Sequence, residues 1–139
     1  MSLDEACKSE IEELHAFIQA WMRGTLPRTT QAFERFDNPL SDTFLVVHPS
    51  GQSDDKTSIC QKVYGAHGVK PDDFTIEIRD IRSRVVHPPW CLLTYEEWQS
   101  SGGKETGRIS SVLFRETNGE SGDGVAWVHL HETCLSEER

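Results

Sequence analysis

The chain has 139 residues, of which 36% are hydrophobic and 27% are charged, a composition typical of one globular domain. Its formal net charge of −9 argues against nucleic acid or an anionic membrane as a partner. No apolar run approaches the roughly 20 residues of a membrane-spanning helix, and no basic and apolar leader follows Met1. We therefore expect a single domain over residues 1–139, located in the cytoplasm.

The first half of the chain predicts three helices and one strand. Apolar residues recur at helical spacing over residues 3–23, and Gly24 is placed to end that helix. A short second helix is expected over residues 28–36 and a third over residues 55–64. Residues 43–48, rich in β-branched and aromatic side chains, form a predicted strand that ends at a turn.

The second half predicts four long strands, at about residues 73–86, 90–100, 107–116 and 125–135. Turn-forming residues separate them, and the last such segment covers residues 118–124. Long strands twist and curl, and preceding helices pack on one face of the sheet. We therefore predict an α+β fold, in which three N-terminal helices pack on a strongly curved antiparallel or mixed sheet that forms a cone with a central pocket.

The cysteines lie far apart, with no metal-binding or redox spacing between them. They fall at apolar positions of predicted elements, which indicates buried free thiols in a reducing compartment. A catalytic thiol is the alternative, but no cysteine has an evidently electropositive setting. The four positions are Cys7, Cys60, Cys91 and Cys134.

Two histidines mark the final predicted strand. A period of two places Trp127, His129, His131 and Thr133 on one face, opposite Val128, Leu130 and Cys134. Polar groups on a central strand need partners, or they face a cavity that holds water or a ligand. We interpret His129 and His131 as pocket-lining residues, because a His-x-His pair alone supplies too few ligands for a metal. No metal and no cofactor is expected.

The strand over residues 90–100 is apolar on both faces. Trp90, Leu92 and Trp98 lie on one face, and Leu93 and Tyr95 on the other. Helices can cover only one side of such a sheet, so the second apolar face indicates a partner subunit. We expect a homodimer through the sheet face.

Two strings, Gly107 to Phe114 and Val128 to Thr133, resemble the paired last strands of the nuclear transport factor 2-like, or cystatin-like, superfamily. The resemblance extends over about residues 4–135 and favours the SnoaL-like and ketosteroid isomerase-like small domains. The same strings resemble the association domain of calcium/calmodulin-dependent protein kinase II. The superfamily includes isomerases, cyclases, dehydratases, hub domains and ligand-binding proteins, so the fold does not imply one function.

The resemblance also tests an enzymatic role. Ketosteroid isomerases place an Asp general base in a turn after the first strand, and His48 takes that position here. Their two oxyanion donors align with Phe17 and Val112, which cannot donate hydrogen bonds. The resemblance therefore argues against steroid isomerisation in that form. His48 remains the candidate general base. The alternative is that His48 is an ordinary histidine in a surface turn.

Further candidates lie on the long strands. Tyr95 and Glu97 share one face of their strand, and Arg108 and Ser110 share one face of the next. An Arg in a cavity would favour a carboxylate-bearing ligand, which it can bind with two hydrogen bonds. The alternative for Glu97 and Arg108 is a salt bridge at the rim of the sheet.

Two helical aromatic residues, Trp21 and Tyr64, are expected above the cone. They form either part of the ligand site or plain core. The function that we favour is the binding of a small, mainly apolar molecule. The alternatives are a SnoaL-like isomerase, cyclase or dehydratase with His48 as general base, and a dimerisation or association module.

Overall fold

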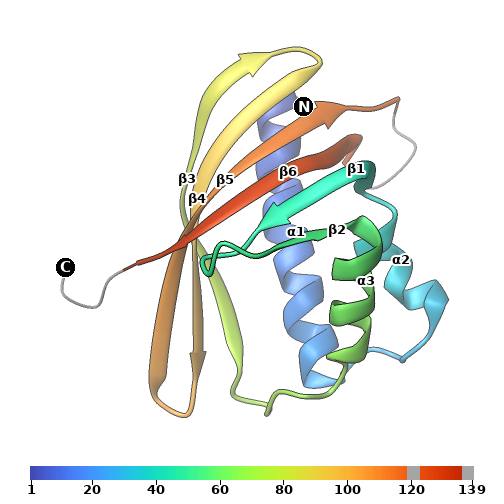
Figure 1. Cartoon of the computed structure of the whole chain (residues 1–139), viewed down its shortest axis with the longest axis vertical. Helices are drawn as coiled ribbons and strands as arrows, with labels where there is room; N and C mark the ends of the chain where they lie inside the picture. Colours follow the sequence, from blue (N-terminus) through green and yellow to red (C-terminus); the bar gives the residue numbers. More distant parts are fainter. Residues whose placement is uncertain (119–122, 136–139) are drawn as a thin grey trace.

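The computed structural model describes residues 1–118 and 123–135, so residues 119–122 of the last predicted turn lie outside it. Within that part of the chain, three helices pack on a six-stranded sheet (Figure 1). The helices are Leu3–Arg23 (α1), Thr30–Asp37 (α2) and Lys56–Gly65 (α3). The strands are Leu40–Val47 (β1), Ser53–Asp55 (β2), Thr75–His87 (β3), Trp90–Ser101 (β4), Lys104–Glu116 (β5) and Val125–Cys134 (β6).

Each helix begins at a side-chain cap that the sequence supplies. The Ser2 hydroxyl accepts a hydrogen bond from the Glu5 amide at the start of α1, and Thr29 and Asp55 cap α2 and α3 in the same way. α1 ends at Gly24, whose φ of 78° is the left-handed conformation that glycine adopts without a steric penalty. None of these helices is long and apolar enough to cross a membrane within the described residues.

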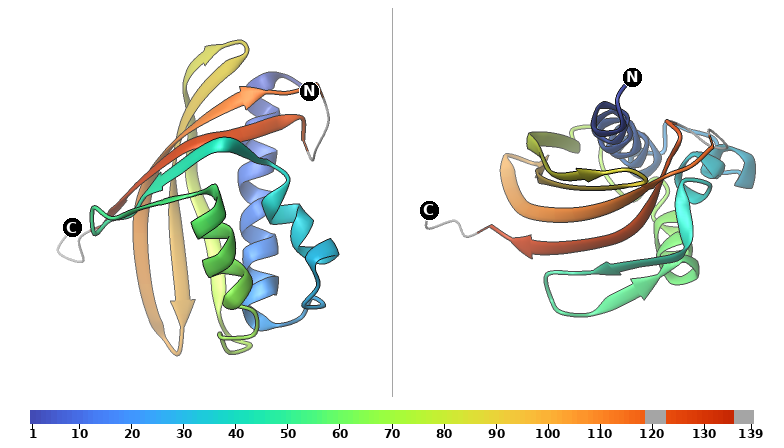
Figure 2. Two further views of the ribbon diagram at one scale, coloured as in Figure 1. Left: turned by 45° about the vertical axis from the view of Figure 1, so that its right-hand side comes forward. Right: turned by 90° about the horizontal axis from the view of Figure 1, so that it is seen from above.

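The sheet is mixed and open. Its strand order is β2-β1-β6-β5-β4-β3, with β1 and β6 parallel and every other neighbouring pair antiparallel. The strands bend around the helical layer, which covers one face (Figure 2). The predicted α+β fold, with three helices on a mixed sheet, is therefore confirmed.

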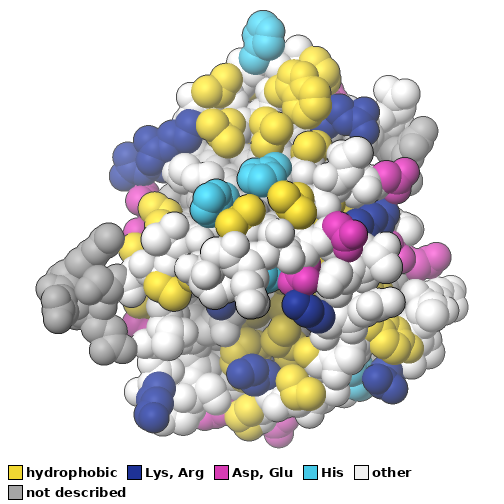
Figure 3. All heavy atoms as spheres, viewed as in Figure 1, with side chains coloured by type: hydrophobic (Ala, Val, Ile, Leu, Met, Phe, Trp, Pro, Cys, Tyr) yellow, Lys and Arg dark blue, Asp and Glu magenta, His cyan; other side chains and the backbone are white. Residues whose placement is uncertain are grey.

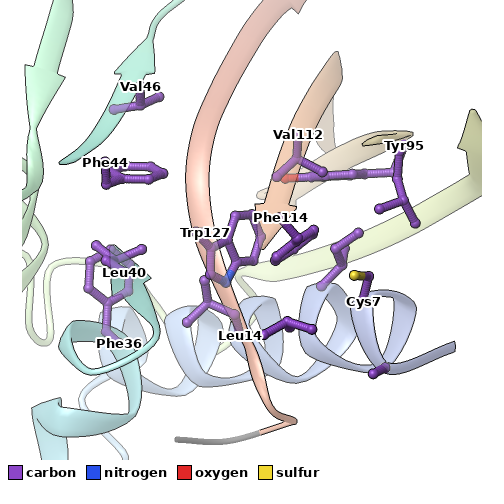
Figure 4. Close-up of a cluster of buried hydrophobic side chains, with 14 of the residues drawn as sticks. Cys7, Leu14, Phe36, Leu40, Phe44, Val46, Tyr95, Val112, Phe114 and Trp127 are labelled. Atoms are coloured by element: carbon purple, nitrogen blue, oxygen red, sulfur yellow. The ribbon is translucent and has the colours of Figure 1, made fainter. Parts of the chain in front are cut away.

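A buried carboxylate ties the helices to the sheet. Glu10 of α1 is fully buried and accepts hydrogen bonds from Arg35 of α2, at 2.9 and 3.1 Å, and from the indole N–H of Trp127 in β6, at 2.9 Å. Around it, Leu14 and Cys7 of α1 pack toward the sheet core (Figure 4). One polar group thus fixes the positions of three elements inside an otherwise apolar layer.

The predicted faces of the last strand are wrong beyond Trp127. Phe114 pairs with Trp127, but Leu113 pairs with His129, so Val128 is one extra residue in β6. Such a β-bulge shifts the alternation by one residue and turns over the rest of the strand. The residues that it brings to the face of Trp127 are Leu130 and Glu132. Those on the outer face are His129, His131 and Thr133.

The cysteines are free thiols. Cys7 and Cys91 are buried as predicted, whereas Cys60 is half-buried and Cys134 is exposed. Burial raises the pKa of Cys7 well above its ordinary value and that of Cys60 to about 11, so both remain protonated thiols at neutral pH. These two residues are unsuited to nucleophilic catalysis.

Replacing Glu10 by Gln is expected to lower the free energy of unfolding by about 2 kcal/mol, because the Arg35 guanidinium loses a charged acceptor. Urea titration followed by circular dichroism measures the loss. Glu13→Gln is the matched control, since Glu13 is 55% exposed and lies 3.5 Å from the same guanidinium. That variant should stay within about 0.5 kcal/mol of the unmodified protein. Equal losses in the two variants would contradict a special role for Glu10.

Candidate functional site

A cavity of about 360 Å³ lies between the helices and the inner face of the sheet. Most of its wall is apolar and comes from all three helices and from β1 and β6. A hollow lined by hydrophobic side chains is visible below the middle of the molecule in Figure 3. Its apolar lining includes Leu14, Ile18, Phe36, Phe44, Ile59 and Leu130.

The polar wall of the cavity is built on three neighbouring strands. Glu97 of β4 and Arg108 of β5 are cross-strand partners, and Arg108 Nη1 donates a hydrogen bond to Glu132 Oε1 of β6 at 3.1 Å. All three side chains line the cavity, and the two carboxylates are almost fully buried. A cation thus lies between two anions, which offsets part of the cost of burying all three charges.

His15 of α1 completes this wall. Its Nδ1 lies 2.7 Å from the Ile11 carbonyl oxygen and its Nε2 lies 3.2 Å from Glu97 Oε1. The carbonyl oxygen and the carboxylate both accept hydrogen bonds, so the His15 ring can donate to both of them only when each of its nitrogens carries a proton. Burial opposes that charge, but the Glu97 carboxylate outweighs it and raises the pKa of His15.

Glu97 is ionised at neutral pH. Burial alone would raise the pKa of its carboxyl, but the charges of His15 and Arg108 hold it at about 2. His15, Glu97 and Arg108 therefore form a charged row along the cavity, with the anion in the middle.

His48 follows the last residue of β1, at the edge of the cavity. Its Nε2 lies 2.6 Å from Asp54 Oδ2. Asp54 also accepts hydrogen bonds from the Ser58 hydroxyl at 2.7 Å and from Lys62 Nζ at 2.9 Å. These bonds, together with the one from His48, hold the pKa of Asp54 well below its usual range. The opposite ring nitrogen, Nδ1, lies 3.7 Å from Glu132 Oε1.

Comparison with known proteins places this geometry in a family. The family model of the sucrose-6-phosphate phosphohydrolase C-terminal domain matches residues 7–136. The chain belongs to this family. Sucrose-phosphatase 2 of Nicotiana tabacum is 26% identical over 129 residues, and sucrose-phosphatase 1 of the same plant is 24% identical over 127 residues. Each alignment covers 91% of this chain, and the chain spans only 30% of each sucrose-phosphatase.

Solved structures place the family in the nuclear transport factor 2-like superfamily, as the sequence predicted. A nuclear transport factor 2-like protein of unknown function from Pseudomonas aeruginosa has a TM-score of 0.83 and 25% identity, over 94% of this chain and 99% of that one. A protein with a cystatin-like fold from Caulobacter vibrioides has a TM-score of 0.68 and 19% identity, over 97% and 91%. A CaMKII hub from S. rosetta has a TM-score of 0.71 and 12% identity, over 94% and 95%.

The structure brings some of the predicted site residues together. His48, Glu97 and Arg108 all line the cavity. Tyr95 and Ser110 are cross-strand partners buried in the inner face of the sheet, and neither hydroxyl has a hydrogen-bond partner among the described residues. Both lie on the same face of the sheet as Glu97 and Arg108, two residues further along the strands, and are absent from the cavity lining.

The other predicted site residues lie elsewhere. Trp21 is fully buried, donates its indole N–H to the Val63 carbonyl oxygen at 2.9 Å, and packs on the Tyr64 ring. These two aromatic residues join α1 to α3 and are not part of the cavity lining. His129 and His131 also lie outside the lining, because the β-bulge turns them to the outer face of the sheet.

Sequence reasoning missed His15 and Glu132. His15 lies beside Leu14 on the buried side of α1, and a histidine there is a recognisable signal for a buried polar contact. Glu132 gave no such signal, because strict alternation assigned it to the face opposite Trp127, whereas the structure has it on the same face as Trp127.

The low pKa of Glu97 makes stability depend on pH. Its ionised form contributes fully above the ordinary pKa of 4.5, and that contribution is lost as the pH falls toward about 2. Glu97→Gln should therefore lower the unfolding free energy by an amount on the order of 3 kcal/mol at neutral pH, and by less in acid. Urea titrations across this pH range measure the difference. The exposed Glu34→Gln is the control, and the same pH dependence in both variants would refute the assignment.

Proposed function

We propose that the chain binds a small, mainly apolar molecule in the cavity between the helices and the sheet. The observation that carries the proposal is a cavity of about 360 Å³ with an apolar lining and one charged wall. Ligand sites commonly have volumes of roughly 300–1,000 Å³ and combine apolar surface with a few polar groups that fix orientation. Burial of the ligand's apolar surface would supply most of the binding free energy.

The charged wall favours a neutral polar group on that ligand. Arg108 is paired with Glu132, and the charge of Glu97 is matched by His15, so these four groups call for no ionic ligand. Lys70, which also lines the cavity, is the cation that an anionic ligand would meet. A guanidinium has five N–H donors, and Glu132 accepts one from Arg108. The remaining donors suit a carbonyl or hydroxyl oxygen at this end of the cavity.

The names of the relatives suggest a different ligand. The two tobacco relatives are named sucrose-phosphatases, and sucrose 6-phosphate is both charged and rich in hydroxyl groups. The apolar lining of this cavity would leave most of those hydroxyls without partners, at a cost in binding free energy. We therefore propose an apolar ligand with one carbonyl or hydroxyl group.

The aromatic ketone 4-phenyl-2-butanone tests this function. We expect it to bind with saturable shifts in heteronuclear NMR spectra, whereas sucrose 6-phosphate should not bind. Leu130→Trp fills the cavity from β6 and should weaken binding at least about tenfold, as steric exclusion removes the buried contacts. Val69→Trp, at an exposed position outside helices and strands, is the matched control and should bind normally. Binding of sucrose 6-phosphate in preference to the ketone would overturn the proposal.

We also propose that two copies associate through the outer face of the sheet. Val85 of β3 and Trp90 of β4 are 51% and 39% exposed, Val85 is the cross-strand partner of Leu92, and Leu92 is that of Leu113; we call these four residues the outer apolar patch. Hydrophobic side chains gather over this part of the sheet in Figure 3. A patch of this kind on a sheet without helices is typical of an interface.

Val85→Glu should therefore convert the dimer into a monomer, because a carboxylate inside an apolar interface is not solvated. Size-exclusion chromatography with light scattering measures the mass. Val69→Glu places the same charge away from the sheet and should remain dimeric. A monomeric mass for the unmodified protein would refute the association.

A further inference from the structure

We propose that a second, polar pocket beside the cavity binds a carboxylate of the ligand, so that the ligand is an apolar oxo- or hydroxycarboxylic acid. The inference rests on the proposed binding function and names the class of molecule that it takes. The second pocket has a volume of about 160 Å³ and lies at the hairpin that joins β4 to β5. Its lining includes Lys70, Phe74, Gln99, Ser101, Lys104 and Thr106.

The lining of the second pocket carries positive charge and no carboxylate. Lys70 and Lys104 both line it, and no aspartate or glutamate among the described residues does. Elsewhere, Lys56 and Lys62 lie 3.7 and 2.9 Å from aspartate carboxylate oxygens. Neither pocket lysine has such a partner within the described part of the chain. In a chain with a net charge of −9, two cations without carboxylate partners at one pocket favour an anion there.

Phe74 positions one of these cations. Its side chain is only 2% exposed, and Lys70 Nζ lies 5.3 Å from the centroid of its ring. Such a cation–π contact keeps the ammonium group over the ring without supplying a counter-charge. The adjacent Asp73 accepts hydrogen bonds from the Ser101 hydroxyl at 3.2 Å and the Gly102 amide at 2.8 Å, and it is absent from the lining. The Lys70 ammonium is therefore available to a ligand.

The second pocket adjoins the cavity, because Lys70 and Gln99 line both. Lysine or arginine side chains border the hollow in Figure 3. Gln99 Nε2 donates a hydrogen bond to Glu97 Oε2 at 2.7 Å, which joins the charged wall to the second pocket. Gln99 is two residues beyond Glu97 on β4, so the two polar sites lie about 7 Å apart along the strand. One elongated molecule can therefore occupy both.

The two polar sites suit different groups of the ligand. At the charged wall, Arg108 is the cross-strand partner of Glu97 and is hydrogen-bonded to Glu132, so an anion bound there would be repelled by two carboxylates. The sequence favoured a carboxylate at Arg108, but the lysines of the second pocket bring no such repulsion. A neutral carbonyl or hydroxyl oxygen therefore suits the wall, and a carboxylate suits the second pocket. The apolar lining of the cavity takes the hydrocarbon part.

The carboxylate contributes specificity and a modest gain in affinity. Lys70 and Lys104 are both exposed, and ion pairs at exposed positions are weak because water competes with them and salt screens them. Two such contacts together should strengthen binding about tenfold at low ionic strength. Burial of hydrocarbon still supplies most of the binding free energy.

The acid 6-oxo-8-phenyloctanoate tests the site, with its methyl ester as the neutral control. It contains the phenylethyl ketone of 4-phenyl-2-butanone, and its four methylene groups span roughly 7 Å between the ketone and the carboxylate. Heteronuclear NMR titrations measure both affinities. We expect the acid to bind about tenfold more tightly than the ester in low salt, and the difference should shrink as salt is added.

Substitution of the lysines separates this site from a general attraction between charges. Lys70→Gln and Lys104→Gln should each weaken binding of the acid about threefold, and the double variant should remove its advantage over the ester. Lys8→Gln is the matched control, because it removes the same charge from α1 at a residue that lines neither pocket. It should bind the acid normally. Circular dichroism confirms that the variants are folded.

Two outcomes would overturn the proposal. If the acid binds no more tightly than its ester, or if Lys8→Gln weakens the acid as much as Lys70→Gln does, the anion site is refuted while the binding function stands on 4-phenyl-2-butanone. If that ketone, the ester and the acid all fail to bind, the binding function fails and the anion site fails with it.

Discussion

The buried carboxylate of Glu10 is the interaction on which the shape of the cavity depends. Its partners come from α2 and from β6, so it joins the helical layer to the sheet at one end of the hollow. A buried carboxylate is stable only while its hydrogen-bond donors, Arg35 and Trp127, stay in place. A shift of α1 along the sheet would break these hydrogen bonds and is therefore unfavourable. An apolar contact would tolerate such sliding more easily, because hydrophobic attraction has little directionality.

The charged wall shows how a protein of this size keeps ionised groups inside. Each anion lies beside a cation: Glu97 beside His15, and Glu132 beside Arg108. Paired charges cost less to bury than single ones, yet each keeps a directional preference for a ligand atom. In the proposed binding function the wall would therefore contribute orientation more than affinity, and the apolar lining would contribute affinity.

Periodicity in the sequence predicted the three helices and the four long strands, since each pattern covers many residues. The sheet was predicted as antiparallel or mixed, and the parallel pairing of β1 with β6 makes it mixed. Periodicity also made Glu97 and Arg108 candidates for a cavity or for a salt bridge at the rim of the sheet, and their cross-strand pairing follows plain alternation in β4 and β5. The short strand β2 has too few residues to give a pattern. The β-bulge at Val128 was equally invisible, because one extra residue depends on the pairing of β6 with its neighbours on both sides.

The parallel pairing of β1 with β6 has a consequence for how the molecule reaches its working form. His48 follows β1 and Glu132 belongs to β6, so the two are neighbours in space although most of the chain separates them in sequence. Contacts between such distant segments close large loops and form slowly compared with local ones. We therefore expect this contact to be among the last to form, and a nascent chain without β6 lacks the cavity wall that Trp127, Leu130 and Glu132 supply.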